Sequence, residues 1–212
     1  MKIRRSVMLT VICVMWVISG CCQGKFNYKQ PTVMPELPSN SVVVEKSKND
    51  AWKDLISNMG KSFFVINNLD KESGFINVSY GGDPCNYIDC GQITIEVTNV
   101  RGKRVYDFPG CKPYIRYESV HNMGLFLNDR KMDLQGRANI IVEELSANTT
   151  KITVSVKYVV TKSHDINQLG TYRRDMLRDT ISFGTNGTGM FPQGCKCAAN
   201  GKFEAELLSL VR

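Results

Sequence analysis

The stretch from Arg137 to Thr161, RANIIVEELSANTTKITVSVKYVVT, carries the clearest structural pattern in this sequence. Its second half alternates apolar and polar residues, with apolar side chains at Ile152, Val154, Val156, Tyr158 and Val160. Such alternation places one side of a strand against a core and the other side in water. Because the polar segment 146–150 separates the two halves, the stretch predicts an antiparallel hairpin with strands at 137–145 and 151–161.

Weaker strand patterns lie on both sides of this hairpin. Apolar alternation or β-branched runs predict further strands at residues 41–46, 62–67, 74–80, 92–97 and 179–185. The turn residues between 62–67 and 74–80 indicate a second hairpin. The long polar stretch 101–135 has only local strand signals, and we expect an irregular insertion there.

Two helices are expected beside these strands. Asn49 or Asp50 can cap a helix that runs to Met59 and stops at Gly60. Residues 200–212 predict an amphipathic C-terminal helix with acidic residues near its positive end. The mixture of strands and helices favours an α+β fold.

The order of these elements resembles the helix-grip lipoprotein domains of the BamC type. The most similar part lies within 41–98 and includes the helix opening Asp50-Ala51-Trp52 and the phrase DKESGFINV at 70–78. The resemblance implies a curved antiparallel sheet packed by an N-terminal and a C-terminal helix.

The first twenty residues have the composition of an export signal. Three basic residues precede an apolar run at 7–18, which is shorter than the roughly 20 residues that span a membrane. The run ends in ISGC at 18–21, which resembles the lipobox of bacterial lipoproteins. This resemblance implies cleavage between Gly20 and Cys21 and acylation of the Cys21 thiol. The alternative is an ordinary secreted protein that is cleaved near Gly20.

These signals predict the domain organisation of the chain and its location in the cell. We expect a signal peptide at 1–20, a lipidated flexible tether at 21–40 and a single α+β domain at 41–212. In such lipoproteins the residue after the acylated cysteine influences sorting. Because Cys22 stands there rather than Asp, the resemblance implies an outer-membrane lipid anchor in the cell envelope, with the domain facing the periplasm.

The charge of the chain argues against nucleic acid as a partner. Removing residues 1–20 lowers the formal net charge from +7 to +4, and the remaining basic residues form no stripe. The expected partners are therefore the membrane, through the acyl groups on Cys21, and another envelope protein.

Cysteine usage fits an oxidising compartment, where disulfides persist. Five cysteines fall in the predicted domain and are the candidates for disulfides: Cys85, Cys90, Cys111, Cys195 and Cys197. Two bridges and one free thiol are the simplest arrangement, with Cys85 or Cys90 bonded to Cys195 or Cys197. The alternative is a zinc site in which Cys85, Cys90, Cys195 and Cys197 bind the metal as thiolates.

The sequence gives no sign of a catalytic set, so we expect no enzyme, no metal and no cofactor. His121 and His164 lie far apart in polar surroundings and are expected to be exposed structural residues. The favoured function is a non-enzymatic binding or assembly module. One alternative is a carrier or sensor of an apolar ligand in a helix-grip cavity. It requires that the space between helix and sheet is not filled by the apolar side chains expected there, which are Phe63, Ile76, Ile95, Val154, Val156, Leu207 and Leu208. The other is thiol-disulfide exchange, for which Cys197 lies just before the last helix.

Overall fold

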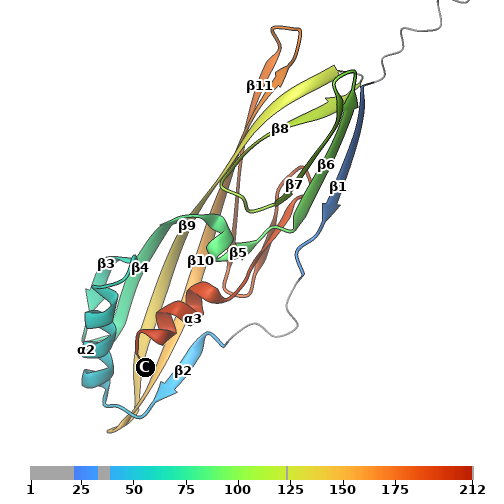
Figure 1. Cartoon of the computed structure of the whole chain (residues 1–212). Helices are drawn as coiled ribbons and strands as arrows, with labels where there is room; N and C mark the ends of the chain where they lie inside the picture. The colour runs from blue at the N-terminus through green and yellow to red at the C-terminus, as the bar shows by residue number, and fades with distance from the viewer. Residues whose placement is uncertain (1–21, 33–38, 123, 212) are drawn as a thin grey trace, which may run out of the picture.

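A computed structural model describes residues 22–32, 39–122 and 124–211 (Figure 1). The predicted signal peptide and the expected cleavage and acylation positions, Gly20 and Cys21, lie outside the described residues. The elements in chain order are β1 (Gln23–Lys29), β2 (Ser41–Val44), α2 (Lys48–Met59), β3 (Val65–Asp70), β4 (Phe75–Gly82), the short 3-10 helix η1 (Pro84–Asn86), β5 (Ile88–Asp89), β6 (Gln92–Asn99), β7 (Gly102–Pro109), β8 (Tyr114–His121), β9 (Gly124–Ser146), β10 (Thr149–Gln168), β11 (Arg174–Gly184), β12 (Thr188–Met190), β13 (Lys196–Ala199) and α3 (Lys202–Ser209).

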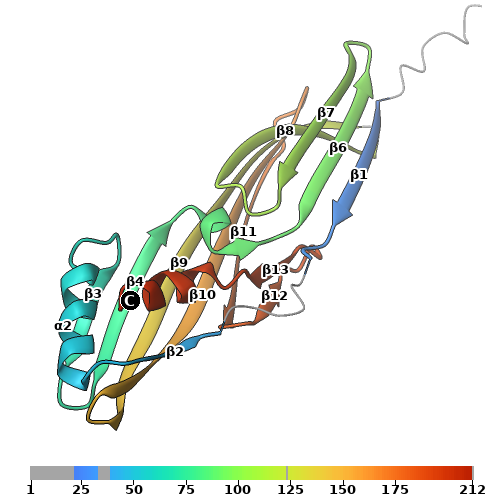
Figure 2. The same ribbon diagram turned by 60° about the horizontal axis from the view of Figure 1, so that its bottom comes forward.

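The long hairpin of β9 and β10 is the spine of the molecule and runs through both ends of it (Figures 1 and 2). These strands have 23 and 20 residues, and their antiparallel register pairs Ser146 with Thr149 at one end and Phe126 with Gln168 at the other. Two further strands pair with each outer edge of the spine. β8 and β4 follow each other along β9, while β11 and β2 follow each other along β10.

The turn end of the spine forms the helical lobe, which we define as β2, α2, β3, β4, α3 and the paired parts of β9 and β10. The alternating residues that predicted the hairpin face this core: Ile152, Val154, Tyr158 and Val160 are fully buried. Leu55 and Met59 of α2 and Phe203 and Leu207 of α3 pack into the same cluster. A small sheet of β12, β13 and β5 continues toward the other lobe.

The opposite end forms the sandwich lobe, in which the sheet β1-β6-β7 covers one face of β8, β9, β10 and β11. Alternate residues of β6 point between the two sheets and are buried with Phe108 and Tyr117. This second core is separate from the helix-side core. One end of the long spine therefore packs against helices, and the other end packs against a second sheet.

The expected helix-grip α+β fold is wrong, because the described chain is mostly β-sheet distributed over several sheets. The expected irregular insertion at 101–135 is wrong as well, since this segment forms β7, β8 and the first half of β9. Its inward positions include Asn128 and Arg130, which are polar although buried. A hydrophobic pattern could not reveal strands whose buried side is partly polar.

The expected flexible tether is also wrong over residues 23–29. This segment is β1, and each of its residues pairs with β6, from Gln23 opposite Thr98 to Lys29 opposite Gln92. Edge pairing of this kind orders a segment through backbone hydrogen bonds, which need no apolar periodicity.

The two helices occur where the sequence predicted them, with shifted ends. The α2 N-cap is Ser47, whose hydroxyl accepts a hydrogen bond from the Asp50 amide at 3.2 Å, rather than Asn49 or Asp50. α3 begins after Gly201 and covers 202–209 instead of 200–212. Within the described residues, no helix is both long enough and apolar enough to span a membrane.

Candidate functional site

A cleft of about 440 Å³ opens between the two sheets of the sandwich lobe. This volume suits a small ligand. The cleft lies at the end where β1 begins, and its walls come from β1, β6, β8, β9, β10 and β11. The lining residues are Gly24, Lys25, Phe26, Ile95, Tyr117, Ser119, Val120, His121, Phe126, Asn128, His164, Ile166, Arg173 and Asp175.

A hydrogen-bonded group of four side chains forms the floor of this cleft. Asn128 is only 3% exposed, and its Nδ2 donates to Ser119 Oγ at 2.8 Å. The same nitrogen lies within hydrogen-bond distance of the carbonyl oxygens of Tyr117 and Phe126. Because carbonyl oxygens only accept hydrogen bonds, the orientation of the Asn128 amide is fixed.

This orientation determines the tautomer of His164. Asn128 Oδ1 accepts a hydrogen bond at 3.0 Å from His164 Nε2, so this nitrogen carries the ring proton. Tyr117 Oη lies 3.1 Å from the same nitrogen and shares that proton. The Tyr117 and Ser119 hydroxyls therefore keep their own hydrogens for another acceptor, and His164 Nδ1 keeps its lone pair.

The floor is uncharged at neutral pH. Burial, followed by the neighbouring charges of Lys162 and Arg130, lowers the pKa of His164 to about 4. Burial also raises the pKa of the Tyr117 phenol. Both effects disfavour the charged forms, so the floor offers neutral hydrogen-bonding groups.

Two buried cations lie beyond the floor, at inward positions of β9 and β10. Arg130 is 3% exposed and donates through Nη2 to the Gly110 carbonyl, while its Nη1 has no hydrogen-bond partner within the described residues. Lys162 is 6% exposed and lies 3.6 Å from Asp179, its ion-pair partner. Two cations with one close carboxylate give this interior a positive potential, which favours an electronegative ligand group.

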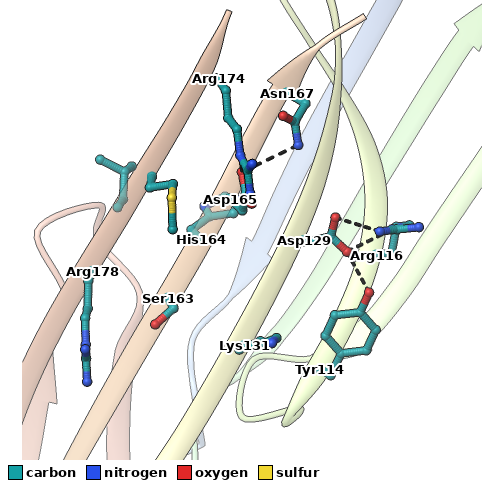
Figure 3. A pocket seen from close by; sticks show the side chains of 12 residues that line it. Tyr114, Arg116, Asp129, Lys131, Ser163, His164, Asp165, Asn167, Arg174 and Arg178 are labelled. Atoms are coloured by element: carbon teal, nitrogen blue, oxygen red, sulfur yellow. Dashed lines mark hydrogen bonds and ion pairs between the residues drawn. The ribbon is translucent and has the colours of Figure 1, made fainter.

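A larger hollow of about 880 Å³ lies on the other side of the same strands (Figure 3). Neighbouring residues of a strand point to opposite faces, so Asp129 and Asp165 face away from the cleft. Each is already neutralised: Arg116 binds Asp129 through two hydrogen bonds, and Arg174 binds Asp165. Exposed pairs of this kind contribute little stability, and the charged side chains of this face lie in water, which makes it the weaker candidate for a ligand with an apolar body.

Both histidines were predicted to be exposed structural residues, which is right for the exposure of His121 and wrong for His164. β8 and β10 both pair with β9, and both His121 and His164 line the cleft although 43 positions separate them. His164 is partly buried. The polar inward positions of β9 were the signal in the sequence, but they become visible only when the strand register is known.

The candidate cysteines lie together where the two lobes meet. Cys85 is bonded to Cys111 and Cys90 to Cys197, while Cys195 is a free thiol whose Sγ lies 3.8 Å from the Cys90 carbonyl oxygen. Of the four thiolates considered for zinc, Cys195 is thus the one that is reduced. Among the described residues, His, Cys, Asp and Glu form no group of three or more that could hold a metal ion.

Within the described residues, most of the side chains that decide the helix-grip carrier alternative fill a core instead of lining a cavity. Those in the helical lobe pack in a single buried cluster: Ile76, Val154, Val156, Leu207 and Leu208. Ile95 belongs to the sandwich core and Phe63 is 90% exposed. The cleft of about 440 Å³ lies between the sandwich sheets instead.

Comparisons of the chain with protein-family models, with curated proteins and with solved structures found no match. The function must therefore be argued from the site itself.

Proposed function

We propose that this protein is a lipid-anchored envelope lipoprotein whose sandwich lobe is a non-enzymatic binding module for an amphiphile. The ligand's apolar body lies in the inter-sheet cleft, and its polar head accepts hydrogen bonds from the Tyr117 and Ser119 hydroxyls. The observation that carries this proposal is the floor of the cleft, where Asn128 fixes the direction of every hydrogen bond.

The walls and the floor have complementary chemistry. Ile95, Phe126 and Ile166 offer apolar surface, which favours the hydrocarbon part of a ligand. The two hydroxyls offer donors, and the buried cations Arg130 and Lys162 add a positive potential behind them. A carboxylate, sulfonate or phosphate ester attached to an apolar body satisfies both parts.

The same geometry supports binding rather than catalysis. Nucleophilic catalysis requires a hydroxyl hydrogen-bonded to its base. Here Ser119 and His164 are each bonded to Asn128. The network thus leaves the Ser119 hydroxyl without a base. The His164 nitrogen beside the Tyr117 hydroxyl carries the ring proton and cannot act as a base either.

The envelope part of the proposal is supported by the signal-like first twenty residues, the lipobox at 18–21 and the two disulfides. Disulfides persist in exported proteins and are rare in the cytosol. Mass spectrometry of the mature amino terminus tests this part. A chain that begins at Cys21 and carries diacylglycerol is expected, and an unmodified terminus would overturn the anchor.

The binding part is tested with the mature chain carrying Cys21→Ser, so that no acyl group competes for the cleft. The probe is anilinonaphthalene sulfonate, which has an apolar body and an acceptor head. Saturable fluorescence is expected, with Kd raised at least about tenfold by Tyr117→Phe or Ser119→Ala, because a hydrogen bond to a charged group contributes roughly 1.5–3 kcal/mol.

The matched control is Tyr114→Phe, which removes a hydroxyl from the charged face. This variant should leave Kd unchanged. If the cleft variants bind the probe as tightly as the unaltered protein does, or if Tyr114→Phe weakens binding equally, the cleft is not the site.

A further inference from the structure

Four chain segments meet at the end of the sandwich lobe. We define them as the tip: residues 22–26, the β6–β7 turn at 99–102, the described residues 121, 122 and 124 between β8 and β9, and the β10–β11 turn at 168–174. Strand pairing places Gln23 opposite Thr98. A Cβ atom on Gly24 would lie 2.9 Å from Val120, and the Leu169 amide donates to the Leu125 carbonyl at 2.8 Å. Figures 1 and 2 both show these segments at one end.

We propose that this tip contacts anionic lipid headgroups directly, so that the cleft opens toward the bilayer. The inference rests on the proposed function at one point, the acylation of Cys21. β1 begins at Gln23, two residues after that cysteine. Since a residue spans at most about 3.6 Å, the acylated residue lies within roughly 7 Å of Gln23. The lack of a long tether thus determines which end of the molecule faces the membrane.

The surface of the tip has the composition of an interfacial site. Three of its segments carry an exposed apolar side chain next to a basic one: Lys25 with Phe26, Val100 with Arg101, and Tyr172 with Arg173. The exposed fractions of Phe26, Val100 and Tyr172 are 66%, 90% and 107%. Apolar and aromatic side chains favour the boundary of the acyl region, while basic side chains bind anionic headgroups.

The charges of the tip are available to a lipid surface. Lys25 and Arg101 take part in no ion pair within the described residues, and both are exposed. Arg173 is paired with Asp175, which is the acidic side chain in this part of the cleft wall. The exposed cations therefore exceed the exposed anions, as an anionic surface requires.

The tip and the cleft share residues, which connects this inference to binding. Gly24, Lys25, Phe26, His121 and Arg173 line the cleft, and all of them belong to the tip. A membrane amphiphile then enters between the two sheets at the bilayer surface. Its acceptor head meets the Tyr117 and Ser119 hydroxyls without passing through bulk water.

The experiment uses the full mature, acylated protein in vesicles of phosphatidylethanolamine and phosphatidylglycerol with brominated acyl chains, which quench a nearby indole. Tyr172→Trp reports on the tip. Phe63→Trp is the matched control, because Phe63 is 90% exposed and lies between α2 and β3 of the helical lobe. The native Trp52 is 8% exposed in α2 and supplies a constant background. We expect quenching at least twofold greater for Tyr172→Trp than for Phe63→Trp, and equal quenching would overturn the inference.

A second arm separates the tip from the anchor. The non-acylated Cys21→Ser protein should sediment with phosphatidylglycerol vesicles, and Lys25→Glu with Arg101→Glu should reduce the bound fraction at least threefold. Lys61→Glu with Lys71→Glu makes the same charge change in the helical lobe and should leave it unchanged. Dimerisation through the tip without vesicles, abolished by Tyr172→Ser, would assign this surface to a second copy and overturn the inference.

The two arms make the failures distinguishable. An unmodified amino terminus together with tip-dependent sedimentation would overturn the anchor and keep the tip. An acylated protein that stays on vesicles while both tryptophan variants are quenched equally would keep the anchor and overturn the tip.

Discussion

His164 Nε2 and Asn128 Oδ1 lie 3.0 Å apart between neighbouring strands of the spine. The Asn128 amide cannot turn over, because its nitrogen faces Ser119 Oγ and two backbone carbonyls. One buried amide therefore determines which nitrogen of the imidazole carries the proton. This relationship gives the cleft floor a defined hydrogen-bonding pattern before any ligand arrives, which reduces the cost of binding.

The low pKa of His164 predicts a pH-dependent stability. The pKa is about 4 in the folded protein against an ordinary value of 6.5, so the unfolded chain binds this proton more readily. The contribution of neutral, buried His164 to the free energy of unfolding is complete above pH 6.5 and is lost as the pH falls toward 4. Urea unfolding between pH 7 and 5 should show this slope, and His164→Gln should reduce it. An unchanged slope in the variant would contradict the assignment.

A buried carboxyl group on α3 predicts the effect of removing one hydroxyl. Glu204 is 1% exposed and accepts hydrogen bonds at 2.8 Å from Tyr158 Oη and from Thr185 Oγ1. Tyr158→Phe leaves one carboxyl oxygen buried without this donor and should lower the free energy of unfolding by about 1–3 kcal/mol. Urea unfolding measures the change. The control Tyr172→Phe removes a fully exposed hydroxyl and should change it by less than about 0.5 kcal/mol.

The approach of α3 to the spine predicts a contrast between two glycines. A Cβ atom on Gly136 would lie 2.4 Å from the Phe203 ring, whereas one on Gly81 meets no atom within 4 Å. Overpacking makes Gly136→Ala destabilising by about 1–3 kcal/mol. Gly81→Ala, on the neighbouring strand, should be neutral or slightly stabilising. Thermal unfolding of the two variants tests the contrast, and equal melting temperatures would show that the helix can move away.

The two disulfides should differ in their contribution to stability. Cys90 and Cys197 are 107 positions apart, and Cys85 and Cys111 are 26 apart. Loop-closure entropy then gives about 5 and about 3.5 kcal/mol. Denaturation of the two double Cys→Ala variants should show the larger loss for Cys90 with Cys197. The opposite order would mean that local packing outweighs chain entropy.

The sequence predicted the hairpin and both helices because these segments bury an apolar side and expose a polar one. The strand at 151–161 is the clearest case, since each of its inward side chains is apolar. The α2 helix carries its buried face within its twelve residues and its N-cap on the residue directly before them. Local patterns of this kind report burial without knowledge of the partner element.

The cleft could not be predicted in this way. Its polar side chains point inward because their strands pair with segments that are distant in the sequence. Asn128, His164 and Tyr117 meet only through the pairing of β8 and β10 with β9. Residues 23–29 likewise form the strand β1 only because they pair with β6, almost 70 positions away. The sequence alone determined which segments have an apolar side to bury. Only the tertiary structure decided which strands pair and therefore which polar groups face one another, since backbone pairing and buried hydrogen bonds depend on contacts distant in sequence.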